Sequence, residues 1–103
     1  MVRITAEEIQ RISDIVRPIA SEYGIEKMYL FGSRARGENT PNSDFDIFIH
    51  PGDIKSLFQV SRLMRDLQIS LDGDVDIVTA GGLKKNVLLT QEIERDGVLL
   101  YER

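Results

Sequence analysis

The sequence lacks cysteine and tryptophan, and its 103 residues include one histidine and three prolines. Without cysteine the chain has no disulfide framework, no thiolate zinc site and no cysteine nucleophile. A single histidine also excludes catalysis that needs a pair of histidines. No run of 18 apolar residues is present, so no membrane-spanning helix is expected. The opening MVRITAEEIQ has no apolar segment typical of a signal peptide, and we therefore expect a cytoplasmic protein.

Positive charge is scarce, because 13 lysines and arginines stand against 17 aspartates and glutamates, a net charge of −4 with histidine neutral. A chain with this acidic balance is not expected to bind nucleic acid directly. Hydrophobic residues make up 42% and charged residues 29%, which is ordinary for a globular protein. The length and the absence of a linker-like stretch predict a single domain over residues 1–103. Chemistry that relies on carboxylates holding metal ions remains open.

The spacing of apolar residues predicts helices over residues 5–23, 56–71 and 83–94. Pro18 lies inside the first of these and is expected to kink or end it. Short strands are predicted at residues 27–31, 44–49, 74–79 and 97–101. The order is helix, strand, turn, strand, helix, strand, helix, strand. It predicts an α+β fold in which helices pack on one face of a small mixed β-sheet.

Aspartates stand on two of these strands, on the side away from the main apolar set. Asp44 and Asp46 are two residues apart, so on a strand their carboxylates share a face. Aspartate is disfavoured in strands, and two such carboxylates repel each other unless a cation lies between them. An exposed polar strand face is the alternative interpretation. Mg²⁺ prefers carboxylate and water oxygens completed by substrate phosphates, so the pair is a candidate metal site.

A second strand repeats the pattern with Asp74 and Asp76. Asp74 follows a turn and can simply be solvated, whereas Asp76 lies between Val75 and Ile77, whose apolar side chains indicate a buried strand interior. If the two strands are neighbours, Asp76 approaches the first aspartate pair. Three carboxylates around one point would be typical of a two-metal site for phosphoryl chemistry.

The segment GSRARG, residues 32–37, follows directly after a predicted strand. Gly32 allows the backbone to approach a ligand closely, and Ser33 offers a hydroxyl beside backbone N–H groups that can bind phosphate. Arg34 and Arg36 add donors suited to phosphate oxygens. The alternative is a plain turn with surface arginines.

Together these motifs resemble the nucleotidyltransferase signature of the DNA polymerase beta superfamily. The signature here is Gly32-Ser33, then ten residues, then Asp44-Phe45-Asp46, then Asp76 within the string VDIV. The string GSRARG…SDFDIFI…DVDIVT and the short length are similar to the minimal nucleotidyltransferases of bacteria and archaea. The resemblance covers about residues 28–79 and implies the polymerase beta-like nucleotidyltransferase fold.

The resemblance also implies a role for each matching residue. Gly32 and Ser33 would hold the triphosphate of the nucleotide, and Asp44 and Asp46 would bind two Mg²⁺ ions, with Mn²⁺ as a substitute. Asp76 would be the third metal-binding carboxylate and would help to deprotonate the acceptor hydroxyl. All three aspartates would therefore be catalytic.

The two arginines of the loop, Arg34 and Arg36, are grouped with the nucleotide-binding residues. Their role is less fixed by the resemblance than that of the aspartates. Contact with the triphosphate, contact with a partner and a salt bridge that holds the loop all remain open.

The implied reaction is metal-dependent transfer of a nucleoside monophosphate, AMP from ATP, to a hydroxyl. Minimal nucleotidyltransferases of this kind are commonly encoded beside a helical HEPN protein, and the pair forms a toxin–antitoxin system. The resemblance thus implies an antitoxin that adds AMP to a tyrosine of a HEPN toxin. A small-molecule nucleotidyltransferase of the antibiotic-modifying type and a non-catalytic antitoxin that blocks its partner sterically are the alternatives.

The last predicted strand, which includes Val98 to Tyr101, is apolar on both faces rather than alternating. A strand at the end of a small sheet should have a polar side where water covers it. This pattern predicts that another chain covers the strand, in a homo- or hetero-oligomer. The alternative is that the first helix packs over it.

Overall fold

The computed structural model of the protein describes residues 4–83 and 87–103. Its helices and strands follow the order α1 (Ala6–Tyr23), β1 (Lys27–Phe31), α2 (Gly32–Arg36), β2 (Phe45–His50), α3 (Leu57–Leu71), β3 (Val75–Thr79), the 3₁₀ helix η1 (Ala80–Leu83), α4 (Val87–Asp96) and β4 (Val98–Glu102). Among the described residues, none of the helices combines the length and the apolar character needed to cross a membrane.

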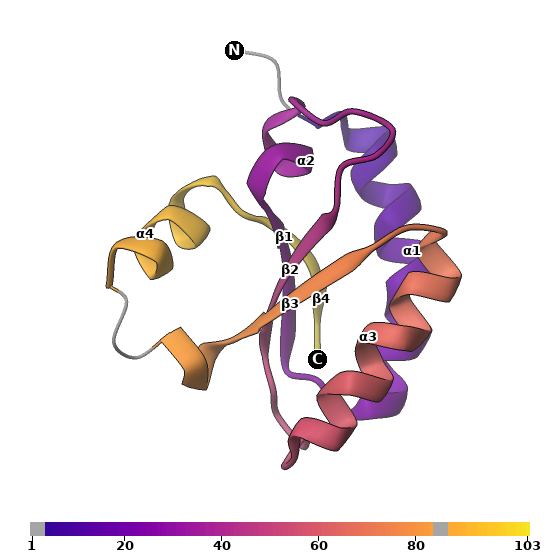
Figure 1. Ribbon diagram of the computed structural model, residues 1–103, viewed down its shortest axis with the longest axis vertical. Coiled ribbons are helices and arrows are strands. Elements are labelled where there is room, and N and C mark those ends of the chain that lie inside the picture. The colour runs from indigo at the N-terminus through magenta and orange to yellow at the C-terminus, as the bar shows by residue number, and fades with distance from the viewer. Residues whose placement is uncertain (1–3, 84–86) are drawn as a thin grey trace.

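The strands form one mixed sheet in the order β3-β2-β1-β4. Strand β1 is antiparallel to both β2 and β4, and β2 is parallel to β3. Figure 1 shows α1 and α3 together on one face of this sheet and α4 on the other. The α+β class and the mixed sheet are thus confirmed.

The main core lies between the sheet and the pair α1 and α3. Strand β2 follows the predicted alternation, because Phe45, Ile47 and Ile49 belong to this core while Asp46 and Phe48 face the opposite side. Side chains from both layers are fully buried there, namely Ile12, Val16, Met28, Leu30, Ile47, Ile49, Leu63 and Leu67. This packing fixes the register of β2 and therefore the face on which Asp46 lies.

Helix α4 covers part of the other face of the sheet, whereas the sequence predicted helices on one face only. Its Ile93 packs against Phe48 in a small second cluster that includes Tyr29, Phe31 and Val78. The physical reason is that β1, β2 and β3 carry apolar side chains on this face as well. Helix α4 therefore covers part of the acidic face, while Asp44 and Asp76 on that face remain exposed.

The helix predicted over residues 5–23 is confirmed as α1. Three local features differ from the prediction. Helix α1 continues past Pro18. Proline has no N–H to donate to the carbonyl four residues earlier, but Pro18 lies on the exposed side of the helix, where water can bind that carbonyl. The residues after β1 form the short helix α2 where only a turn was expected. The helix predicted over residues 83–94 is observed as α4, over Val87–Asp96. Leu83 belongs instead to the separate 3₁₀ helix η1, and residues 84–86 lie outside the described part of the chain.

Candidate active site

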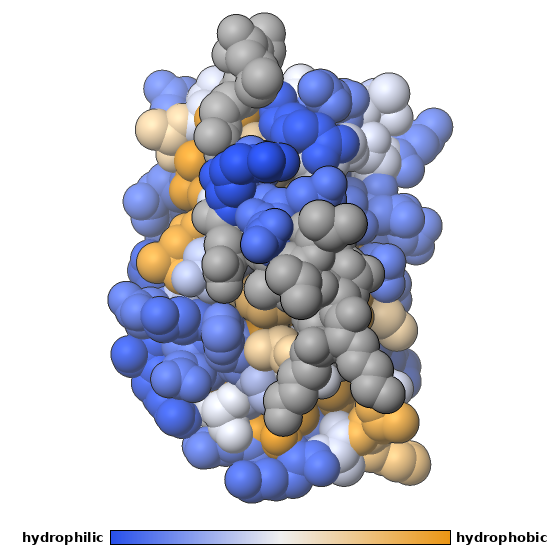
Figure 2. Space-filling view, turned by 90° about the vertical axis from the view of Figure 1, so that its left-hand side faces the viewer, coloured by the Kyte–Doolittle hydropathy of each residue, from blue (hydrophilic) through white to orange (hydrophobic). Residues whose placement is uncertain are grey.

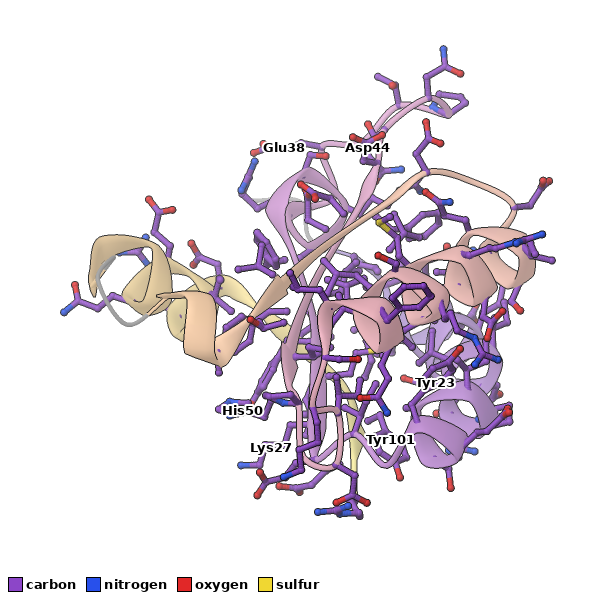
Figure 3. The ribbon with its side chains drawn as sticks, turned by 60° about the horizontal axis from the view of Figure 1, so that its bottom comes forward. Tyr23, Lys27, Glu38, Asp44, His50 and Tyr101 are labelled. Atoms are coloured by element: carbon purple, nitrogen blue, oxygen red, sulfur yellow. The ribbon has the colours of Figure 1, made fainter. Side chains whose placement is uncertain are left out.

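The register of the two parallel strands brings two predicted aspartates face to face. Asp46 of β2 is the direct partner of Asp76 of β3, and partners in a ladder project to the same side of a sheet. Asp44 lies one residue before β2, and Figure 3 shows it at the end of that strand. Asp46 is half-buried, whereas Asp44 and Asp76 are exposed. The structure therefore brings these aspartates to one end of the sheet.

Negative charge is concentrated at Asp46. Burial raises the pKa of its carboxyl, and the neighbouring carboxylates of Asp76 and then Asp44 raise it further. The guanidinium of Arg36 lowers this pKa and so opposes the other effects. A carboxylate whose ionised form is destabilised in this way is suited to binding a cation.

Gly32 lies directly against the Asp46 carboxylate. Its φ is +74°, in the left-handed region that favours glycine, and a Cβ built on it would overlap Oδ2 of Asp46. Phe31, the last residue of β1, pairs with Asp46 across the sheet, which places the start of α2 at this point. The side chain of Ser33 has no hydrogen-bond partner within the described part of the chain, so its hydroxyl is available to a ligand.

The two arginines of α2 point to different surroundings. Nε and Nη2 of Arg34 donate hydrogen bonds to the carbonyl oxygen of Ser43 at 3.1 and 2.7 Å, and its guanidinium lies 3.9 Å from the centre of the Phe45 ring. Nε of Arg36 donates to Oε2 of Glu38 at 3.0 Å. The charge of Arg36 also lowers the pKa of Asp46, so this arginine acts electrostatically on the acidic site.

A pocket of about 200 Å³ lies beside Gly32, between the start of α2 and α4. Arg36 lines it on one side, and Glu92 and Asp96 line it from α4. Figure 2 shows hydrophilic side chains gathered over the upper part of the face that carries α4. Sequence reasoning missed the two α4 residues because nothing in the pattern of that helix indicated which face of the sheet it would cover.

Carboxylate oxygens are the ligands that Mg²⁺ and Mn²⁺ prefer, so the chemistry of the three aspartates fits these ions. The geometry alone does not complete a site. Among residues 4–83 and 87–103, no three histidine, cysteine, aspartate or glutamate side chains stand close enough together to hold a metal ion. A metal ion here would need oxygens from a ligand in addition to those of the protein.

The raised pKa of Asp46 makes a prediction about stability without metal. The folded state holds this proton more tightly than the unfolded chain, so stability falls as pH rises above about 3.9, the ordinary pKa of aspartate. Asp46→Asn removes that loss. In EDTA the variant should melt at a higher temperature than wild type at neutral pH, and the difference should vanish below about pH 4. An equal difference at both pH values would contradict the raised pKa of Asp46.

Comparison with known proteins gives consistent matches. The family described as polymerase beta, nucleotidyltransferase, matches residues 13–103. "Putative protein adenylyltransferase MJ0435" of Methanocaldococcus jannaschii is 33% identical over 89 residues, which are 84% of this chain and 96% of the relative. Protein adenylyltransferase MntA of Thermococcus cleftensis is 32% identical over 91 residues, 87% and 92% of the two chains. A structure described as "Crystal structure of the toxin-antitoxin with AMP-PNP" aligns with a TM-score of 0.74 at 26% identity, over 88% of this chain and 73% of that one.

Proposed function

The chain belongs to the polymerase beta nucleotidyltransferase family, and from this premise we propose that it transfers AMP from ATP to a tyrosine hydroxyl of a helical HEPN toxin, which it thereby inactivates as an antitoxin. The observation that carries the proposal is the placement of Asp46 opposite Asp76, with Gly32 against the Asp46 carboxylate. Relatives named protein adenylyltransferases, one third identical over most of the chain, support protein as the acceptor.

Each part of the site has a defined task in this reaction. The backbone at Gly32 lies against the Asp46 carboxylate, and Arg36 lines the pocket beside Gly32. This backbone, the hydroxyl of Ser33 and the guanidinium of Arg36 would bind the triphosphate. Asp44, Asp46 and Asp76 would hold two Mg²⁺ ions, with phosphate oxygens completing their coordination. When bound, the ions neutralise charge on the attacking and leaving oxygens.

The bonds and protons of the transfer balance as follows. The tyrosine oxygen forms a bond to the α-phosphorus, the bond from that phosphorus to the bridging oxygen of the leaving group breaks, and pyrophosphate departs. The hydroxyl proton passes to the carboxylate of Asp76, which is exposed and therefore accessible to an acceptor from outside the domain.

The acceptor must come from another molecule. In the described part of the chain the sheet, its helices and the site use nearly all residues, and Asp44 and Asp76 lie open at the surface. The exposed side chain of Leu99 on β4 leaves apolar surface for a partner, although α1 covers the other face of that strand. An added AMP would bring negative charge and bulk to a toxin that acts on RNA, which accounts for its inactivation.

Substitutions at Ser33 test its contact with the triphosphate. Ser33→Ala should weaken ATP binding by about 0.5–1.5 kcal/mol, the contribution of one hydrogen bond. Ser33→Asp should be far more damaging, because it places a carboxylate against phosphate. Titration of each variant with ATP and Mg²⁺ measures the two effects. Equal binding by wild type and Ser33→Asp would mean that this residue does not face the nucleotide.

The reaction itself is tested with ATP labelled at one phosphate at a time. We would incubate the protein with Mg²⁺ and a helical HEPN protein as the acceptor, using ATP labelled at either the α- or the γ-phosphate. The proposal expects label on the partner from α-labelled ATP only, with release of pyrophosphate. Label from γ-labelled ATP would indicate phosphoryl transfer, and full inhibition of the partner without any label would leave a steric antitoxin.

A further inference from the structure

We propose that Arg34 is a positioning residue that holds Asp44 in place for metal binding and does not contact the nucleotide. The proposal rests on the proposed function, because it concerns the metal-binding role of Asp44. Its basis is that Arg34 contacts the residues on both sides of Asp44. The guanidinium donates two hydrogen bonds to the Ser43 carbonyl oxygen, and it stacks on the ring of Phe45.

The ring of Phe45 places Arg34 on the far side of the sheet from the acidic site. Phe45 is 4% exposed and belongs to the core beneath α1 and α3, whereas Asp46 faces the opposite side. A guanidinium stacked on this ring therefore lies toward α1. The positive charge of Arg34 also acts on Glu8 of α1, because Arg34 is one of the charges that lower the pKa of the Glu8 carboxyl. To reach a triphosphate beside Asp46, Arg34 would have to give up these contacts.

Asp44 depends on this support because it lies before the first residue of β2. The loop before it, residues 37–43, contains a turn in which the Ser43 backbone N–H bonds to the Thr40 carbonyl and the Thr40 N–H bonds to the Ser43 hydroxyl. Those bonds hold the loop to itself. The start of the loop is bonded to α2 through the backbone, and the side chain of Arg34 ties its end, at the Ser43 carbonyl, to the same helix. Fixing both neighbours of a metal-binding carboxylate limits the orientations that it can take.

The chain offers a matched control two residues away. Arg36 has the same side chain on the same short helix, but it lines the pocket beside Gly32, together with Phe31 and Ile93 on the side of the sheet opposite the main core. Arg34→Gln and Arg36→Gln remove the same charge from the same helix. A difference in Mn²⁺ or ATP affinity between the two variants therefore reflects the different positions of the two guanidinium groups.

The test measures two affinities for wild type, Arg34→Gln, Arg34→Lys and Arg36→Gln, well below their melting temperatures. Mn²⁺ affinity with ATP present is followed by electron paramagnetic resonance, and ATP affinity without metal is titrated in EDTA. Arg34→Gln should weaken Mn²⁺ binding on the order of tenfold and leave metal-free ATP binding unchanged. Arg36→Gln should do the reverse. Arg34→Lys should restore little, because an ammonium reproduces neither the paired bonds nor the stacking.

The possible results separate the alternatives. Weaker metal-free ATP binding by Arg34→Gln, restored by Arg34→Lys, would overturn the proposal and make Arg34 a phosphate ligand. A lower melting temperature with unchanged Mn²⁺ affinity would also overturn it, leaving a purely structural role. If Arg34→Gln does not fold, the same readings are taken from Arg34→Lys. Failure of wild type to bind Mn²⁺ with ATP would contradict the proposed function as well, and only that result does so.

Discussion

Asp46→Asn should abolish AMP transfer while the domain remains folded. Asparagine keeps the size of the side chain but removes the charge that a divalent ion requires, and loss of such an ion removes several kcal/mol of transition-state stabilisation. We therefore expect the rate to fall by about a thousandfold or more. The fold should survive, because Asp46 is half-buried among like charges rather than part of an ion pair that the substitution would break.

The matched control for this prediction is Asp74→Asn. Asp74 is exposed, lies just before β3 and two residues from Asp76, and contributes to the fold through its backbone carbonyl, which accepts a hydrogen bond from the Phe45 N–H at 2.8 Å. Its substitution should leave transfer within a few-fold of wild type. Single-turnover labelling of the partner measures both variants. An active Asp46→Asn protein, or equal losses in the two variants, would show that Asp46 is not a catalytic carboxylate.

Gly32→Ala should impair both stability and transfer. A methyl group at this position would overlap the carboxylate of Asp46, and the residue has a φ of +74°, which alanine adopts with strain. The strain alone is worth about 1–3 kcal/mol. Relief of the overlap requires Asp46 or the start of α2 to move, so transfer should fall more than the loss of stability explains.

Denaturant unfolding and transfer rates, compared with those of Gly81→Ala, measure the two parts of this effect. Gly81 lies in η1, has an ordinary φ, and has open space where a Cβ would be placed, so its substitution should be close to neutral. Wild-type activity in a stable Gly32→Ala protein would mean that the backbone at Gly32 does not need to approach Asp46.

The faces of the strands could be predicted from sequence because a period of two is unambiguous. Phe45, Ile47 and Ile49 alternate with Asp44, Asp46 and Phe48, and that alternation correctly put Asp46 on the face away from the main core. The sequence predicted that Asp76 would approach Asp46 only if their two strands were neighbours. The parallel pairing of β2 with β3 meets this condition and places Asp46 opposite Asp76. The stretch 44–79 therefore carried most of the information about the site.

The remaining features depend on contacts that no local pattern encodes. Helix α2 has five residues, too few to show a helical period, so the opposite directions of Arg34 and Arg36 could not be read from GSRARG. The position of α4 follows from the packing of Ile93 on Phe48, two residues far apart in the sequence. Both features became visible only once the sheet had brought distant segments together.

We expect the aspartates of β2 and β3 to transfer AMP to a protein partner. The most direct measurement is the intact mass of the helical partner after co-expression with wild type or with the Asp44→Asn, Asp46→Asn double variant. Wild type should add AMP units to a tyrosine of the partner, whereas the double variant should leave the partner unmodified and lose its protection from the toxin. An unmodified partner in both cases, with full protection by the double variant, would contradict this expectation.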